Sequence, residues 1–190
     1  MQDWHNHSIF SDGENTIAQL VENAQKWGLD QFAVSDHYHM IKDLEEYHSE
    51  LSRHPISKSV EIYAPHIVQN KVDINWCNRK LDFVIIEEIS NSISIEDIVS
   101  KFTVPIIVAH PNPRIIPRLI GFDISYEFNM SIPLPNRRTM YELVKNKMKV
   151  RVGSDIHDID SEFSILLLKQ ANDVAVAINK GYVPDWYVRC

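Results

Sequence analysis

The chain has 190 residues, of which 44% are hydrophobic and 24% are charged. This composition is typical of a folded globular protein and argues against disorder and membrane insertion, and the length fits a single domain over 1–190. The formal net charge of -7 disfavours nonspecific binding to nucleic acid, without excluding a local channel for it, and favours a small substrate.

The chain begins MQDWHNHSIFSDGE, which lacks a basic segment followed by an apolar one. We therefore expect no signal peptide and a cytoplasmic protein. Cys77 and Cys190 are far apart and lack metal-type spacing, so Cys77 is predicted to be a buried thiol and Cys190 a tail residue. The sequence leaves the oligomeric state open.

Seven strand-like segments alternate with helical patterns along the chain. The expected strands are 2–5, 31–37, 60–64, 81–88, 104–110, 121–128 and 150–157. Apolar residues at helical spacing predict a helix over 16–27 that ends at Gly28. Ser94 and Asn136 are expected to cap two further helices, over 94–102 and 137–147, and one or two more are expected over 162–179.

Alternating strands and helices predict a parallel α/β fold, either an open sheet or a closed barrel. Histidines and carboxylates collect at the carboxyl ends of most expected strands, where a barrel gathers its functional groups. No glycine-rich loop follows the first strand, as a nucleotide-binding sheet would usually require. A barrel is therefore favoured.

Two histidine or carboxylate pairs have the spacing of metal ligands. His5 and His7 end the first strand, and Asp155 and His157 end the last one. Residues two apart on a strand share a face, so each pair can direct both side chains to one side. Imidazole and carboxylate are ligands that Zn, Mn and Fe share, and a set without cysteine suits a hydrolytic site better than a structural one.

Three further residues follow strands at the same rim: Asp12, His37 and His110. Each alone has an ordinary structural interpretation as a turn residue, a cap or a core histidine. Together they would place unrelated buried polar groups at the ends of four strands, which is costly unless something partners them. Shared metal ions supply such partners.

The sequence resembles the PHP (polymerase and histidinol phosphatase) domain family over nearly the whole chain. The matching motifs are DWHNHSIFSDG at 3–13, SDH at 35–37, His110-Pro111 and SDIH at 154–157. The resemblance implies a distorted seven-stranded (β/α)7 barrel, similar to a TIM barrel, with a multinuclear metal site. In the implied ligand set His5, His7 and Asp155 bind one metal, His110 helps to bind a second, and Asp12, His37 and His157 bind a third.

The second metal site departs from the family pattern. The resemblance implies a glutamate that bridges the first two metals, and Glu61 occupies its place. After a strand such as LDFVI the family usually has a histidine ligand, where this chain has Ile89. Either this site is weakened, or a carboxylate compensates; Glu87 shares a face with residue 89, whereas Glu88 points away. An added carboxylate ligand would favour Mn or Fe.

The expected activity is hydrolysis of a small phosphomonoester by a metal-activated water at two or three divalent ions (Mn, Fe or Zn). Asp155, His157 and Arg114 are expected to take part in catalysis, with Arg114 supporting the phosphate. Glu127 ends the sixth expected strand, where the family often has a glutamate, and it is a candidate for orienting substrate or a ligand histidine, without a firm role. His39 is left out of the ligand set. The alternatives are a PHP-type phosphodiesterase or nuclease, and a degenerate PHP scaffold without turnover.

Overall fold

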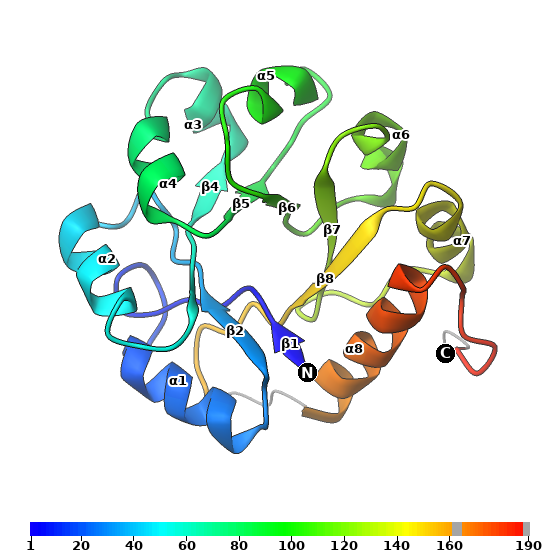
Figure 1. Ribbon diagram of the computed structural model, residues 1–190, viewed down its shortest axis with the longest axis horizontal. Helices are drawn as coiled ribbons and strands as arrows, with labels where there is room; N and C mark the ends of the chain where they lie inside the picture. Colours follow the sequence, from blue (N-terminus) through cyan, green and yellow to red (C-terminus); the bar gives the residue numbers. More distant parts are fainter. Residues whose placement is uncertain (161–164, 188–190) are drawn as a thin grey trace.

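The computed structural model describes residues 1–160 and 165–187. The described strands are all paired in parallel and form two sheets, with the orders β1-β2-β3 and β4-β5-β6-β7-β8. Their bounds are β1 Gln2–Asp3, β2 Gln31–Val34, β3 Ser57–Lys58, β4 Glu61–Tyr63, β5 Val84–Glu87, β6 Ile106–Val108, β7 Ile124–Asn129 and β8 Lys149–Gly153. Figure 1 shows these strands around the middle of the molecule, with the helices outside them.

Two isolated parallel bridges connect the sheets just beyond the ends of named strands. Asn6 pairs with Ile156, and His37 pairs with Glu61. The parallel α/β class expected from the sequence is confirmed. The closed seven-stranded barrel is not, because the structure has eight strands in two sheets among its described residues. The additional strand is the two-residue β3, which was not expected because Ser57 and Lys58 carry no apolar alternation.

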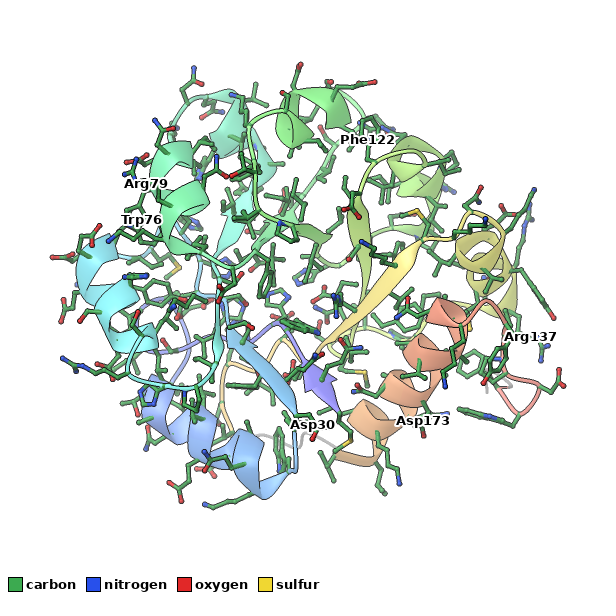
Figure 2. The ribbon with its side chains drawn as sticks, viewed as in Figure 1. Asp30, Trp76, Arg79, Phe122, Arg137 and Asp173 are labelled. Carbon is green, nitrogen blue, oxygen red and sulfur yellow. The ribbon has the colours of Figure 1, made fainter. Side chains whose placement is uncertain are left out.

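The helices lie between the strands in chain order. They are α1 Ile17–Lys26, α2 Leu44–Leu51, α3 Ala64–Val68, α4 Ile74–Lys80, α5 Ile95–Val99, α6 Ile116–Leu119, α7 Arg137–Lys145 and α8 Ile165–Asn179, with a 3₁₀ turn η1 at Pro113–Ile115. In Figure 2 the labelled side chains of Arg79, Arg137 and Asp173 lie at the periphery of the molecule, on α4, α7 and α8. In the described part of the chain no helix is both long and apolar enough to cross a bilayer.

The predicted helix boundaries follow from local capping. Thr16 accepts a hydrogen bond from the Gln19 backbone N–H at the start of α1, and Gly28 follows its end with a φ of 67°. Ser94 caps α5 and Asn136 caps α7, as expected. Residues 162–164 of the last expected helix lie outside the described residues. The short helices α2, α3, α4 and α6 were not predicted.

The central strands are buried on both faces. Val84 and Ile86 of β5 belong to the large core shared with the helices, whereas Ile85 joins a smaller cluster with residues in or next to β2, β5 and β6. That smaller cluster comprises Ala33, Phe83, Ile85, Ile107 and Ala109, with Trp4 packed against it. Parallel strands that are buried on both faces have continuous apolar sequences. This explains why the segments LDFVII (81–86) and VPIIVA (104–109) are apolar without alternation. The strand ends are therefore the places where polar groups gather.

Cys77 is fully buried on α4, as the sequence predicts, whereas Cys190 lies outside the described residues. Burial raises the pKa of the Cys77 thiol to about 12. A raised thiol pKa keeps the unreactive protonated form dominant up to that pH. In a Cys190→Ser variant, we expect a disulfide reagent at pH 8 to modify Cys77 only after denaturation. Rapid modification of the native variant would contradict this expectation.

Candidate metal centre

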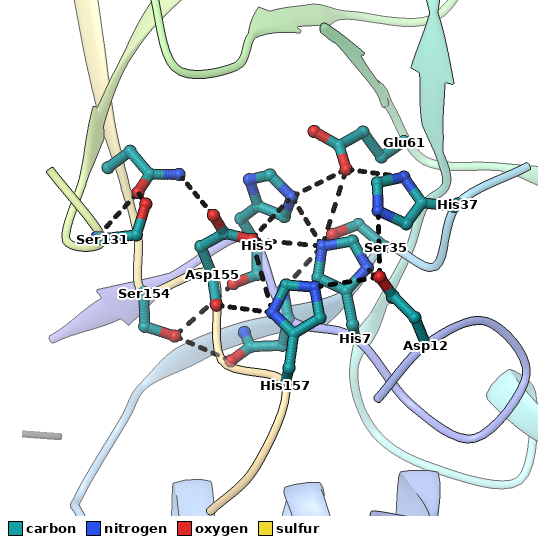
Figure 3. Close-up of polar contacts among 12 residues, drawn as sticks. His5, His7, Asp12, Ser35, His37, Glu61, Ser131, Ser154, Asp155 and His157 are labelled. Carbon is teal, nitrogen blue, oxygen red and sulfur yellow. Dashed lines mark hydrogen bonds and ion pairs between the residues drawn. The ribbon is translucent and has the colours of Figure 1, made fainter. Parts of the chain in front are cut away.

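The segment after β1 is held in an extended conformation between its neighbours. The Asn6 carbonyl accepts a hydrogen bond from Ser35 N at 2.8 Å, and the His7 backbone N–H donates to the Ile156 carbonyl at 2.9 Å. The Asn6 side chain also donates to the Ala33 carbonyl at 3.0 Å. Because side chains alternate along an extended segment, His5 and His7 lie on the opposite side from Asn6 and face the cluster shown in Figure 3.

Three residues at or shortly beyond the ends of strands adopt left-handed backbone conformations. Glu88 follows β5 with a φ of 53°, His110 follows shortly after β6 with 44°, and Asp155 follows shortly after β8 with 59°. Non-glycine residues rarely adopt such conformations, which cost free energy and concentrate at functional sites. The chain therefore turns sharply at the end of each of these strands. Two of the three, His110 and Asp155, were expected to bind metal.

The expected ligands converge into overlapping groups whose donor atoms lie within 4.8 Å of one another. The groups are His5-His7-Asp155, His5-Glu61-His110, His7-Asp12-His37-His157 and His37-Glu61-Glu87. All nine residues predicted as ligands belong to at least one group. The first group is the set implied for the first metal, and the third contains the set implied for the third metal together with His7.

Two carboxylates lie in the middle of the cluster. Asp155 Oδ1 is 3.6 Å from His5 Nε2 and 3.3 Å from His7 Nε2. Glu61 Oε2 is 3.3 Å from His5 Nε2, 3.5 Å from His7 Nε2 and 3.1 Å from His37 Nδ1. Its other oxygen, Oε1, is 3.7 Å from His110 Nε2. Glu61 thus lies between imidazoles that come from three different strand ends.

Asp12 forms a second part of the cluster, nearer to solvent. Its carboxylate lies 3.6 Å from His7 Nδ1, 3.6 Å from His37 Nε2 and 3.4 Å from His157 Nε2. The side chains of Asp12 and His157 are each 39% exposed, whereas His7 is fully buried. This group therefore opens to the outside, and His7 connects it to the buried part.

The buried polar atoms at the centre fit divalent metal ions. Both carboxylate oxygens of Glu61 and the Nδ1 atoms of His7 and His37 are buried without a hydrogen-bond partner. His5 Nε2 and His7 Nε2 face each other at 3.0 Å. Burying a carboxylate without hydrogen bonds costs several kcal/mol, whereas ions bound between these atoms would satisfy them together.

The electrostatics favour ionised carboxylates at this position. Burial alone would raise the pKa of Glu61, but the positive charge of nearby His5, with smaller contributions from other imidazoles, lowers it to about 2. Burial likewise opposes ionisation of Asp155, yet the adjacent imidazoles of His110 and His7 hold the pKa of its carboxyl well below the usual range. Burial lowers the pKa of His7, which favours the neutral imidazole that binds metals.

Glu87 joins the cluster on a different side from the one expected. Its Oε1 lies 3.5 Å from His37 Nδ1, and its group contains His37 and Glu61; the group that contains His110 does not include it. Ile89 packs against the hydrophobic core and lines a cavity beside His110. The compensating role of Glu87 stays a prediction, and the geometry connects it to His110 through Glu61.

A cavity of about 440 Å³ lies beside His110. Its walls include Ile89, Asn91, Asn112 and the exposed Arg114. Arg114 belongs to the 3₁₀ turn η1, and its backbone N–H donates to the Asn112 side chain at 3.0 Å. The structure thus places the arginine singled out from the sequence in a cavity that adjoins the cluster.

One buried residue that supports the cluster, Asp36, was missed in the sequence. Asp36 accepts hydrogen bonds from the Ser8 backbone and hydroxyl, both at 2.7 Å, and from the Ser11 hydroxyl at 2.6 Å. It thereby fixes the loop between His7 and Asp12. The sequence signal was its place in SDH, where it reads equally well as a cap.

His39 was left out of the ligand set, and the structure places it outside the four groups. Its ring centroid lies 5.6 Å from that of His37 and 5.4 Å from that of His66. His66, on α3, therefore lies beside His39. Loop conformation after β2 decides this position, and strand alternation gives no information about it.

A parallel α/β fold with overlapping histidine and carboxylate groups at its strand ends defines a protein with a candidate multinuclear metal centre. The family model described as "PHP domain" matches residues 3–102, which is more than half of the 190 residues. The chain belongs to the PHP domain family. The matched part carries six of the cluster residues: His5, His7, Asp12, His37, Glu61 and Glu87.

A protein from Thermotoga maritima named "Probable histidinol-phosphatase" is 34% identical to this chain over 70 residues. The similar segment covers 33% of this chain and 30% of the relative. The chain thus matches less than a third of the relative's length.

Divalent ions should stabilise the folded protein through Glu61. An ion at 100 times its Kd adds about 2.7 kcal/mol, which raises the Tm of a protein of this size by about 5–10 °C. We expect Mn²⁺ or Zn²⁺ to produce this shift in thermal unfolding of the wild type, and Glu61→Gln to lose most of it. Glu142→Gln, on α7, is the matched control and should keep the shift. Equal shifts in both variants would show that Glu61 is not a ligand.

The contribution of Glu87 can be measured by counting ions. We expect Glu87→Ala to bind fewer Mn²⁺ ions per chain than the wild type in equilibrium dialysis followed by elemental analysis, because it removes one carboxylate from its group. Glu88→Ala is the control, since Glu88 belongs to none of the four groups. An unchanged count in Glu87→Ala would rule out a role as ligand.

Proposed function

We propose that this protein is a metal-dependent phosphoesterase that hydrolyses a small phosphomonoester. The observation that carries the proposal is the buried Glu61, whose unpartnered carboxylate lies among histidines of a PHP-family chain. The similar protein named as a probable histidinol-phosphatase supports phosphate esters as the substrate class. We further propose that 1–190 forms one PHP-type unit related to a seven-stranded barrel.

Two or three divalent ions would be held by the overlapping groups. His5, His7 and Asp155 form one candidate set, and Asp12, His37 and His157 join His7 in another. The two remaining groups, His5-Glu61-His110 and His37-Glu61-Glu87, share Glu61. Such ions, whether Mn, Fe or Zn, activate water and polarise phosphoryl oxygens when bound.

The residues of the chain provide the rest of the site. The cavity beside His110 offers room for the organic part of a small ester, with Ile89 as an apolar wall and Asn91 and Asn112 as hydrogen-bonding groups. Arg114 supplies a cation at the cavity wall for the phosphate oxygens. The exposed side of the Asp12 group leaves a route for water.

The first group gives the sharpest test of catalysis. Losing about 3 kcal/mol of transition-state stabilisation lowers kcat about 100-fold, so His7→Ala should lose at least that much aryl phosphatase activity with Mn²⁺ or Zn²⁺. His48→Ala, on α2 and outside the four groups, should retain activity.

A set of three substrates distinguishes the phosphomonoesterase from the phosphodiesterase and from a scaffold without catalysis. An aryl phosphate, histidinol phosphate and a bis-aryl phosphodiester are tested with each ion. Faster turnover of the diester would favour the phosphodiesterase or nuclease alternative. No turnover of any of them, with His7→Ala indistinguishable from the wild type, would leave a PHP scaffold without catalysis.

A further inference from the structure

Glu127 is a buried carboxylate of β7 that belongs to none of the candidate ligand groups. It is 2% exposed, and it lies behind His5 as seen from the cluster. The sequence offered it as a candidate for orienting substrate or a ligand histidine, without a firm role. Because a buried carboxylate is costly unless its oxygens accept hydrogen bonds, its contacts indicate what it does.

Three donors converge on this carboxylate. Oε1 lies 2.7 Å from Nδ1 of His5. Oε2 accepts hydrogen bonds from the backbone N–H of His110 at 2.9 Å and from the side-chain amide of Asn129 at 3.1 Å. Both oxygens therefore have partners: Oε1 contacts His5, and Oε2 contacts His110 and Asn129.

The contact with His5 determines which ring nitrogen faces the cluster. A carboxylate only accepts hydrogen bonds, so His5 keeps its proton on Nδ1 when the charged ring loses its other proton, as metal binding by an imidazole requires. Nε2 then carries the lone pair, and it lies 3.3 Å from Glu61 Oε2 and 3.0 Å from His7 Nε2. Glu127 thus orients the nitrogen that points into the candidate site.

The other oxygen supports two more candidate ligands. The His110 backbone has a φ of 44°, and its N–H is the donor to Glu127, so the hydrogen bond holds a left-handed turn in place. The Asn129 amide that binds Glu127 also donates to Asp155 Oδ2, at 3.3 Å. One carboxylate is therefore connected to His5, His110 and Asp155.

The fold leaves space for this arrangement at Gly153. A Cβ atom at Gly153 would overlap Glu127 Oε1 and the Cβ of His5. Gly153 is paired with Asn129 in the sheet, so the missing side chain lies where Glu127 reaches across toward His5. The glycine ahead of the SDIH motif is thus explained by the position of Glu127.

We propose that Glu127 is the positioning residue of the metal centre, which fixes His5 as an Nε2 ligand and braces His110 and Asp155. This role rests on the proposed metal-dependent function. A carboxylate or carbonyl that holds a ligating histidine typically changes metal affinity 10–100-fold when it is lost. Glutamine cannot replace it, because an amide has one acceptor atom and the donors approach both oxygens.

The test is metal binding by Glu127→Gln, measured without substrate. We expect competition titrations with a chelating dye to show about 10–100-fold weaker binding of Zn²⁺ or Co²⁺, with an altered Co²⁺ absorption spectrum. Far-UV circular dichroism checks folding, and Glu142→Gln is the matched control. Gly153→Ala leaves every ionisable group unchanged and should weaken binding in the same direction.

The tautomer of His5 provides a test that needs no variant. Long-range ¹H–¹⁵N spectra of the Zn²⁺-loaded wild type should show His5 protonated on Nδ1. Coordination through Nδ1, or Glu127→Gln binding within about twofold of the wild type, would overturn the positioning role alone. A wild type that binds no ion in the same titration would overturn the proposed metal dependence as well.

Discussion

The structure depends on one constraint, namely that carboxylates and imidazoles buried at the strand ends need partners. Glu61 is fully buried, and neither of its carboxylate oxygens has a hydrogen bond within the described part of the chain. Histidines from three strand ends lie within 4 Å of it. A core with such a centre is costly unless positive charge is shared among these groups, which is why metal ions account for the arrangement better than any isolated ion pair.

The backbone around this centre brings the candidate ligand residues together. The isolated bridges Asn6–Ile156 and His37–Glu61 bring the ends of the two sheets together, so that ligand groups include residues from opposite ends of the chain. Left-handed turns at His110 and Asp155 redirect their side chains after short strands. Behind the candidate ligands, the Glu127 carboxylate contacts the His5 imidazole and accepts a hydrogen bond from the His110 main chain. Strand ends, turns and supporting carboxylates thus act as one unit.

The predictions that rested on local chemistry agreed with the structure. Ser94 and Asn136 cap helices as expected, since capping needs only neighbouring residues. The parallel α/β class followed from alternation. The closed seven-stranded barrel was not confirmed, because strand count depends on pairing between distant segments, and the short β3 carries no pattern of its own. Short helices such as α6 were missed for a similar reason, since four residues give too little periodicity.

By itself the sequence determined the family and the chemical types of the candidate ligands, because the DWHNH, SDG, SDH and SDIH motifs are local in the chain. Only the tertiary structure decided which of them share a group. It placed Glu87 with His37, where strand alternation had suggested the Ile89 side, and it connected Glu127 with His5 across 122 residues of sequence. The alternation of side chains along a strand determines which residues share a face. The twist and closure of neighbouring strands decide which faces meet, and that information lies in contacts between segments far apart in the chain.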